Sequence, residues 1–208
     1  MFITLEGPEG SGKSTQLTLL AAFLEEEGFS VLATREPGGT AIGDQIRAIL
    51  HDVHNTEMES ATEYLLYSAS RAQLVREMIG PALAENRIVL CDRYADSSIA
   101  YQGYGRGLNL DDLHIITKFA TGGLVPDLTF LLDIDVEEGL SRRISGDEEM
   151  NRLDLEAVAF HQRVRDGYHQ LASANPERWV IIDAAQSPAQ IQQELRQISL
   201  DRIGEKVQ

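Results

Sequence analysis

Short runs of apolar residues alternate along the chain with longer segments in which apolar residues recur at helical spacing. The short runs cover residues 2–5, 29–33, 88–91, 128–134 and 179–182. Near-continuous apolar runs of this length are typical of strands that are covered on both faces. The pattern therefore predicts a mainly parallel sheet of five strands.

The segments between these runs are predicted to be helices. In residues 14–27 the apolar side chains follow the i, i+3, i+4, i+7 pattern of one helix face, and Gly28 is placed to end this helix. A long periodic segment at 57–84 contains Gly80-Pro81, where we expect a break or bend. Further helices are predicted at residues 110–120, 136–144, 155–174 and 188–203. This alternation favours a three-layer α/β sandwich, and the length favours a single domain over residues 1–208.

The charge balance narrows the range of partners. Lys and Arg number 18 and Asp and Glu number 33, so the net charge is −15. A surface this acidic repels nucleic-acid backbones and anionic membranes, so neither kind of partner is expected. A small anion held by a local group of arginines remains compatible with it.

Cysteine content and the N-terminal sequence indicate the compartment. Cys91 is the single cysteine, which excludes an intrachain disulfide and a cysteine-based zinc site. The first ten residues, MFITLEGPEG, lack the basic start and long apolar core of a secretory signal. No stretch approaches about 20 apolar residues. We therefore expect a soluble cytoplasmic protein.

Residues 7–14 match the phosphate-binding pattern G-x-x-x-x-G-K-[ST], between a predicted strand and a predicted helix. Backbone N–H groups of such a loop and the following helix N-terminus form an anion site. Lys13 is expected to reach the β- and γ-phosphates of ATP, and the Ser14 hydroxyl to ligate Mg²⁺. The predicted ATP-binding residues are Gly7, Pro8, Glu9, Gly10, Ser11, Gly12, Lys13, Ser14 and Thr15.

An acidic residue at the end of a neighbouring strand should complete the metal site. Asp92 ends the run at 88–91 and is predicted to hold Mg²⁺ through water. Asp133 and Asp183 also follow apolar runs, but neither has an arginine beside it as Asp92 has Arg93.

The rest of the sequence separates the classes of P-loop protein. Residues 117–120, TKFA, lack the aspartate of a guanine-binding motif, which argues against a GTPase. A kinase that acts on a phosphorylated acceptor must bring two anions together and so needs arginines along the chain. Such arginines are present at Arg35, Arg71, Arg93, Arg142, Arg143 and Arg152.

Four further segments resemble the bacterial thymidylate kinases, and the resemblance covers the whole chain. These segments are TREPGGT at 34–40, LYSASRAQ at 66–73, DRYADSSIAYQG at 92–103 and RVRDGY at 163–168. The resemblance implies a nucleoside monophosphate kinase-like fold with a small lid at about 141–153. It also implies transfer of the γ-phosphoryl of ATP to dTMP with Mg²⁺, giving dTDP and ADP for dTTP biosynthesis, and a homodimer.

The same resemblance implies a set of residues that bind dTMP. Arg35 and Arg93 match arginines that hold the acceptor phosphate, and Glu9 matches an acid near the 3′-hydroxyl. Tyr67, where most relatives have Phe, stacks on thymine, and Arg71 donates to its O4. The full implied set is Glu9, Arg35, Pro37, Tyr67, Arg71, Arg93, Ser97, Ser98, Tyr101 and Gln102, with Tyr101 excluding a 2′-hydroxyl.

Catalysis is expected from Lys13, Arg93 and an arginine of the lid. The phosphate loop contains no arginine of its own, as in the bacterial branch of the family. Arg142 and Arg143 precede the acidic segment 146–151, and Arg152 follows it, so any of the three could reach the transferring phosphoryl. Gly146 is the expected hinge, and Asp147, Glu148 and Glu149 make the lid acidic.

Two other functions remain open at this stage. One is a kinase of the same fold that acts on dUMP, UMP or another nucleotide, against which Tyr67, Arg71 and Tyr101 argue. The other is a nucleotide-binding switch without catalysis, against which the arginines suited to a second anion argue.

Overall fold

The computed structural model describes residues 1–146 and 150–207. It contains one parallel sheet of five strands in the order β2-β3-β1-β4-β5. The strands are β1 (Phe2–Glu6), β2 (Val31–Arg35), β3 (Ile88–Asp92), β4 (Leu128–Asp133) and β5 (Trp179–Asp183). The predicted sheet is thus confirmed, and each apolar run overlaps one strand.

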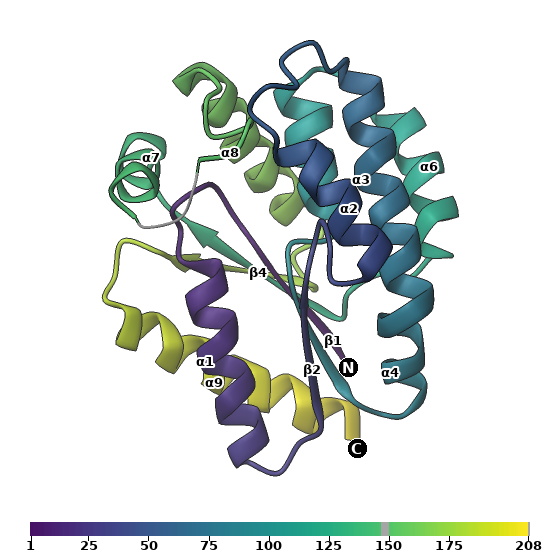
Figure 1. Cartoon of the computed structure of the whole chain (residues 1–208). Helices are drawn as coiled ribbons and strands as arrows, with labels where there is room; N and C mark the ends of the chain where they lie inside the picture. The colour runs from purple at the N-terminus through teal and green to yellow at the C-terminus, as the bar shows by residue number, and fades with distance from the viewer. Residues whose placement is uncertain (147–149, 208) are drawn as a thin grey trace.

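Helices cover both faces of this sheet, which makes the predicted three layers (Figure 1). They are α1 (Lys13–Glu26), α2 (Ala41–His51), α3 (Ser60–Leu74), α4 (Gly80–Ala84), α5 (Ala95–Ser98), α6 (Leu110–Thr121), α7 (Val136–Ser145), α8 (Val158–Ala174) and α9 (Pro188–Val207). Two π-helical stretches, η1 (Val75–Ile79) and η2 (Ile99–Gly105), extend α3 and α5. The hydrophobic pattern did not predict α2, and α8 begins at Val158 rather than at residue 155.

The break expected near Gly80-Pro81 is not an interruption of the helix. The Gly80 N–H donates to the carbonyl of Val75, five residues back, so the chain continues from α3 through η1 into α4. A π-helical turn adds one residue to the turn before the proline. Pro81, which has no N–H to donate, then lies in the first turn of α4, where that loss has little cost.

The core consists of apolar layers on the two sides of the sheet. Alternate residues of β1 face opposite ways: Leu5 packs with Leu20 of α1 and Leu195 of α9, whereas Phe2 packs with Leu74 of α3. On the second side a further apolar cluster joins η2 and α8 to β4 and β5; its largest members are Tyr101, Phe160, Tyr168 and Trp179. The two sides together bury both faces of every central strand.

The strand register gathers three chain segments at one edge of the sheet. Asp92 at the end of β3 pairs with Leu5 of β1 and with Arg35 of β2. The loop after β1, the loop after β2 and the segment after β3 therefore start beside one another. The carboxyl ends of parallel strands are where ligands bind in folds of this class.

None of the helices in the described part of the chain is both long and apolar enough to span a membrane.

Candidate functional site

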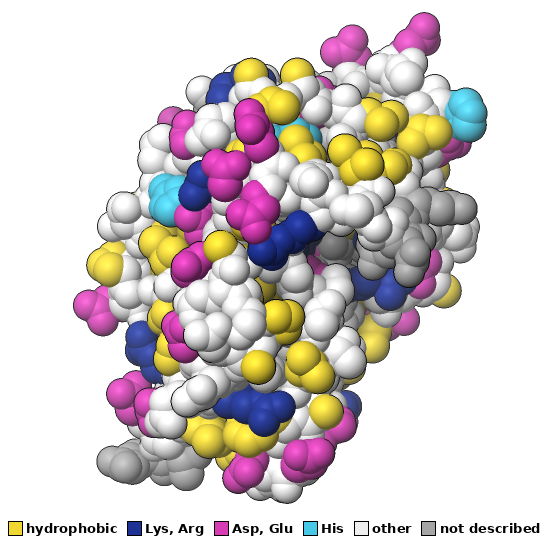
Figure 2. Space-filling view, turned by 90° about the vertical axis from the view of Figure 1, so that its left-hand side faces the viewer, with side chains coloured by type: hydrophobic (Ala, Val, Ile, Leu, Met, Phe, Trp, Pro, Cys, Tyr) yellow, Lys and Arg dark blue, Asp and Glu magenta, His cyan; other side chains and the backbone are white. Residues whose placement is uncertain are grey.

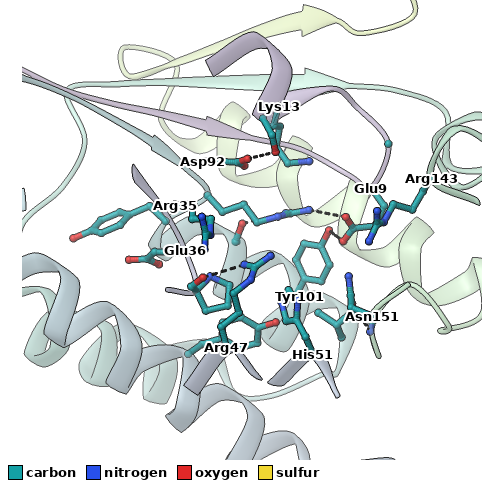
Figure 3. Close-up of a pocket in the computed structure, with 18 of the residues that line it drawn as sticks. Glu9, Lys13, Arg35, Glu36, Arg47, His51, Asp92, Tyr101, Arg143 and Asn151 are labelled. Atoms are coloured by element: carbon teal, nitrogen blue, oxygen red, sulfur yellow. Dashed lines mark hydrogen bonds and ion pairs between the residues drawn. The ribbon is translucent and has the colours of Figure 1, made fainter. Parts of the chain in front are cut away.

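A cavity of about 720 Å³ opens at this carboxyl edge of the sheet (Figure 3). Its lining brings together most of the residues that the sequence predicted for the site. They are Glu9, Gly10, Gly12, Lys13, Ser14, Thr15, Arg35, Pro37, Tyr67, Arg71, Asp92, Arg93, Ser97, Ser98, Tyr101, Gln102, Arg142 and Arg143. Gly7, Pro8 and Ser11 belong to the same loop without lining the cavity, and Arg152 is not among the lining residues although Asn151 and Leu153 are.

The phosphate loop runs from the end of β1 into α1. Gly10 and Gly12 have φ values of 68° and 84°, which side chains with a Cβ rarely adopt. No described side chain caps α1 at Gly12, so the first N–H groups of the helix are available to an anion. Lys13 folds back onto the loop, where its Nζ donates to Pro8 O at 2.8 Å and to Ser11 Oγ at 3.0 Å. Burial, helped by repulsion from Arg93, lowers the pKa of Lys13 to about 8.

The first turn of α7 packs directly on this loop. A Cβ added to Gly139 would lie 2.4 Å from the carbonyl oxygen of Glu9, and one added to Gly10 would lie 2.0 Å from that of Gly139. The two backbones therefore touch with no side chain between them. Since Glu9 lies at this contact, α7 holds in place the part of the loop that enters the cavity.

Ser14 and Asp92 face each other at the metal position that the sequence predicted. The Ser14 hydroxyl donates to Asp92 Oδ2 at 2.5 Å. Asp133 is instead engaged by Arg165 through two hydrogen bonds of 2.8 and 2.9 Å, and neither it nor Asp183 lines the cavity. The described residues include no cluster of three His, Cys, Asp or Glu that could hold a metal unaided. One hydroxyl and one carboxylate suit Mg²⁺, which takes most of its ligands from phosphates and water.

Arg93 stands in the middle of the cavity on a strained backbone. Its φ is 66°, in the left-handed region, and its N–H donates to Leu5 O at 3.0 Å. The guanidinium donates to Glu9 at 2.9 Å and to Gly7 O and the Tyr168 hydroxyl at 3.1 Å each. A left-handed non-glycine residue costs roughly 1–3 kcal/mol and is typical of functional sites. The fold therefore fixes this guanidinium beside the phosphate loop.

Glu9 is held by Arg93 and by a tyrosine from η2. The Tyr101 hydroxyl donates to Glu9 Oε1 at 2.7 Å, and Glu9 and Tyr101 project into the same space (Figure 3). Burial alone would raise the pKa of Glu9, but Arg93 and then Lys13 lower it to about 2. Glu9 is thus an anion that accepts hydrogen bonds at neutral pH.

Arg71 lines the same cavity and is almost fully buried. Its Nε donates to Glu36 at 2.7 Å, and its Nη2 donates to Ser98 Oγ at 3.0 Å and to Tyr94 O at 3.1 Å. Although burial opposes its charge, Glu36 keeps the pKa of Arg71 above its ordinary value. Nη1 is buried and has no hydrogen-bond partner among the described residues. Tyr67, one turn earlier on α3, lines the cavity beside it.

The arginines of the expected lid divide into two groups. Arg142 and Arg143, in the last turn of α7, line the cavity; Arg142 donates to Ala184 O, and Arg143 pairs with Asp154 at 3.0 Å. Arg152 is buried between two residues that line the cavity, Asn151 and Leu153, and pairs with Glu63 of α3. The acidic lid residues Asp147, Glu148 and Glu149 lie outside the described residues.

Sequence reasoning missed two cavity residues on α2, Arg47 and His51. Arg47 and Arg35 approach the cavity from one side and Arg143 from the other (Figure 3). Burial and the nearby Arg47 lower the pKa of His51 to about 4, so its imidazole is neutral. One feature of the sequence could have indicated α2, namely Thr40 as an N-cap residue. Its hydroxyl caps α2 by accepting from the Gly43 N–H at 3.0 Å.

The sequence also gave no reason to single out Glu6, the last residue of β1. Its buried carboxyl accepts from the Tyr94 N–H, the Ser97 hydroxyl and the Tyr168 hydroxyl. Burial and the nearby Asp96 raise the pKa of Glu6 to about 7. Because Ser97 and Tyr168 also contact Arg93, Glu6 helps to hold the Arg93 side chain in position through these two residues.

The space-filling view shows how charge is distributed on the face that carries α7 and α9. Acidic side chains are spread over it, and Lys and Arg side chains form a few separate groups, some of them near its centre (Figure 2). A chain with a net charge of −15 thus keeps local groups of cations that can attract an anionic ligand.

Comparison with known proteins agrees with this geometry. A family model described as thymidylate kinase matches residues 5–195. A thymidylate kinase of Roseiflexus sp. (strain RS-1) is 54% identical over 198 residues, which cover 90% of this chain and 88% of the relative. One of Trichlorobacter lovleyi is 52% identical over 209 residues, 98% of each chain. The crystal structure of thymidylate kinase from Ehrlichia chaffeensis superposes with a TM-score of 0.77 at 34% identity, over 95% of this chain and 97% of that one. This chain therefore belongs to the thymidylate kinase family.

Proposed function

We propose that this protein transfers the γ-phosphoryl of ATP to dTMP, giving dTDP and ADP, a step of dTTP biosynthesis. One observation carries the proposal. One cavity is lined by the phosphate loop, by Arg93, which contacts that loop, and by a buried arginine beside a tyrosine, Arg71, one of whose N–H groups has no partner among the described residues. This arrangement suits a donor triphosphate and an acceptor monophosphate in line with each other.

The donor end would be held by the loop and by Lys13. The N–H groups at the start of α1 would bind phosphate oxygens, and Lys13 would exchange its contacts with Pro8 and Ser11 for the β- and γ-phosphates. Ser14 and Asp92, which are hydrogen-bonded to each other, would hold Mg²⁺, Asp92 through water. When bound, Mg²⁺ neutralises charge on these two phosphates.

The acceptor end would orient dTMP for attack by its own phosphate oxygen. Arg93 and Arg35 would hold this phosphate, and Arg93 would shield it from the repulsion of the γ-phosphoryl. Glu9 would accept the 3′-hydroxyl, and the ring of Tyr101, whose hydroxyl donates to Glu9, would contact the 2′-carbon. Tyr67 would stack on thymine, beside Pro37, and Nη1 of Arg71 would donate to its O4.

We further propose that the segment at about 141–153 acts as a lid over the transferring phosphoryl. Arg142 and Arg143 line the cavity, and either would serve as an arginine finger in cis. For Arg152 the ion pair with buried Glu63 supports a different role, as an anchor of the chain that follows the lid. Closure of such a lid would keep water from the γ-phosphate.

An exposed apolar surface supports the proposal of a homodimer. We define it by Ile42 and Ile49 of α2, Leu65 of α3, and Ile115 and Phe119 of α6, all of them exposed. These three helices lie side by side on the flank of the molecule away from α7 (Figure 1). A group of exposed apolar side chains on adjacent helices is typical of protein–protein contacts. We therefore propose that two copies of this chain associate through this surface. We also propose that the protein is cytoplasmic.

The test is an assay of ADP release with ATP, Mg²⁺ and a panel of acceptors: dTMP, dUMP, UMP, dCMP, AMP, GMP and none. Strong turnover with dTMP, weaker turnover with dUMP and little otherwise is the expected result. Equal rates with UMP and dTMP would contradict the role of Tyr101 and indicate a broader pyrimidine kinase. ADP release that needs no acceptor would indicate an ATPase or a switch.

A further inference from the structure

Two side-chain contacts join α3 to the segment that follows β3. Nη2 of Arg71 donates to Ser98 Oγ at 3.0 Å, and Nε2 of Gln102 donates to Glu63 Oε1 at 2.8 Å. Glu63, Tyr67 and Arg71 are four residues apart in turn on α3, and Ser98 and Gln102 are four apart on α5 and η2. Since residues four apart lie on one helix face, the two contacts flank the ring of Tyr67.

Glu63 is an ionised acceptor at the centre of a buried cluster. Its side chain is 0% exposed, and its carboxylate accepts from Arg106 at 3.1 Å and from Arg152. Burial raises the pKa of a carboxyl, but hydrogen bonds from Arg106 and Gln102 and the charges of both arginines hold that of Glu63 below its ordinary value. An ionised carboxylate only accepts hydrogen bonds. Any group that contacts Glu63 must therefore present a donor to it.

This requirement decides which way the Gln102 side chain faces. The two ends of a glutamine amide have nearly the same shape, but one donates and the other accepts. Gln102 is 1% exposed and lines the cavity, so its amide has two choices of orientation. With Nε2 committed to Glu63, the acceptor Oε1 is left for the cavity, and it has no hydrogen-bond partner among the described residues.

Two residues that line the cavity then keep one donor, which is itself buried, and one acceptor without partners among the described residues. The donor is Nη1 of Arg71, and the acceptor is Oε1 of Gln102. Thymine and uracil present the complementary pair, a carbonyl at C4 beside the N–H at N3. Cytosine presents an amine and a bare ring nitrogen, which would meet a donor with a donor and an acceptor with an acceptor.

We propose that Glu63 is a positioning residue for base specificity: it fixes the amide of Gln102 so that only a pyrimidine with a ring N–H is accepted. This inference rests on the proposed dTMP kinase activity and names the group that sets its preference. Arg71 cannot reverse its role, because a guanidinium has no acceptor. Gln102 can reverse its role by turning its amide, and its hydrogen bond to Glu63 prevents this turn.

The experiment compares dTMP with 5-methyl-dCMP, which keeps the ring and the methyl group but reverses both polar positions. Both are measured with wild type, Glu63→Gln and Glu63→Asp. The amide in Glu63→Gln can accept or donate, so Gln102 is free to turn. Glu63→Asp keeps the charge between the two arginines, and therefore favours folding, but withdraws the acceptor from Gln102 by one methylene. Arg106→Gln is the matched control, because it removes an ion pair from the same carboxylate and leaves both its oxygens as acceptors.

We expect wild type to favour dTMP by roughly 10⁴-fold in kcat/KM, as sites built on a hydrogen-bond pattern do. Glu63→Gln should lower this ratio at least tenfold. Most of the change should come from a higher KM for dTMP, with kcat at saturation within about threefold of wild type and KM for ATP unchanged. The ratio for Glu63→Asp should lie between those of wild type and Glu63→Gln. Arg106→Gln should lower the unfolding temperature and leave the ratio within about twofold of wild type.

Three results would overturn the inference. One is a folded Glu63→Gln or Glu63→Asp variant with the wild-type ratio. Another is a fall in kcat without a change in the ratio, which would indicate a general loss of structure. A third is an equal loss of discrimination in Arg106→Gln. If wild type itself does not use dTMP, the proposed function fails, and this outcome is distinct from a kinase that keeps its selectivity without Glu63.

Discussion

Arg93 is the residue whose position the fold controls most closely. Its left-handed backbone and its contacts with Glu9, Gly7 and Tyr168 fix a guanidinium beside the phosphate loop, where the proposed donor and acceptor phosphates would meet. We expect Arg93→Ala to lower kcat/KM for dTMP about 1,000-fold, or roughly 4 kcal/mol, because the two phosphates would repel each other. Arg93→Lys should recover only part of this loss, since an ammonium lacks the two-pronged geometry. Steady-state kinetics with varied dTMP measure both effects.

Arg165→Ala is the control for Arg93→Ala. Arg165 forms a comparable ion pair with Asp133 but does not line the cavity. It should lose some stability and keep kcat/KM within about threefold of wild type. The role of Arg93 would be refuted if Arg93→Ala also remained within threefold.

Lys13 gives the site a dependence on pH. Its pKa is about 8 in the free protein because burial and Arg93 disfavour the charge. Bound phosphates would favour the charge and raise this pKa, so ATP binding should take up nearly one proton at about pH 9 and almost none at pH 7. Affinity for ATP should therefore fall as pH rises above 8. Calorimetric titrations in two buffers of different ionisation enthalpy measure the uptake.

Lys13→Arg is the control, because an arginine remains charged over this range. Its binding should show no proton uptake at pH 9, and uptake equal to that of wild type would assign the proton to another group. The same ionisation of Lys13 has the opposite effect on folding: the free energy of unfolding rises, rather than falls, as pH increases above 8. The unfolded chain binds the Lys13 proton more tightly, so the buried charge lowers the free energy of unfolding below pH 8, and this cost disappears as pH rises toward 10.5.

Residue-level roles could be predicted from the sequence only where neighbours in the chain decide them. Lys13 and Ser14 belong to one continuous loop pattern, and both line the cavity. Arg152 lies in sequence beside the expected lid, yet it pairs with Glu63, 89 residues away on α3. The support of Arg71 by Glu36 likewise joins groups 35 residues apart. Such pairings depend on the fold and leave no local pattern.

Among the elements, those with a periodic apolar face were predictable, and those defined by their neighbours were not. Strands buried on both sides read as apolar runs, and α1 reads as one stripe that ends at Gly28. On α2 only Gly43 and Leu50 are buried, and its remaining apolar residues include the exposed Ile42 and Ile49. A helix with so narrow a buried face gives little signal. The stretches η1 and η2 depart from the spacing on which the prediction relies.

The contact between α7 and the phosphate loop is a test at the scale of elements. In Gly139→Ala the new Cβ would meet the carbonyl of Glu9, 2.4 Å away, and backbone at such a contact can only move apart. We expect kcat/KM to fall at least tenfold for both ATP and dTMP, because Glu9 and the loop would shift together. Stability should fall by about 1–3 kcal/mol. Kinetics and urea unfolding measure the two effects.

Gly204→Ala provides the comparison, since Gly204 lies within α9 and has open space around a new Cβ. It should raise stability by up to about 1 kcal/mol and leave kinetics unchanged. Wild-type kinetics in Gly139→Ala would show that the contact between α7 and the loop does not position the site.

At the scale of the whole molecule, the proposed homodimer can be tested on the apolar surface of α2, α3 and α6. Phe119 is 81% exposed at its edge, and Ile115 is 69% exposed one turn earlier on α6. The acidic charge of the chain opposes association, so a second copy would have to gain enough from apolar burial to offset that repulsion.

We expect light scattering after size exclusion to give about twice the chain mass of 23.0 kDa for wild type. Phe119→Asp should give monomers at micromolar concentration, because it places a charge in an apolar contact. Leu19→Asp, at an exposed position of α1 away from this surface, should remain dimeric. The helices α2 and α3 also carry Arg47, Tyr67 and Arg71, which line the cavity. In the Phe119→Asp monomer the KM for dTMP should therefore rise more, relative to wild type, than the KM for ATP. A wild-type monomer, or a Phe119→Asp dimer, would remove this surface as the site of assembly.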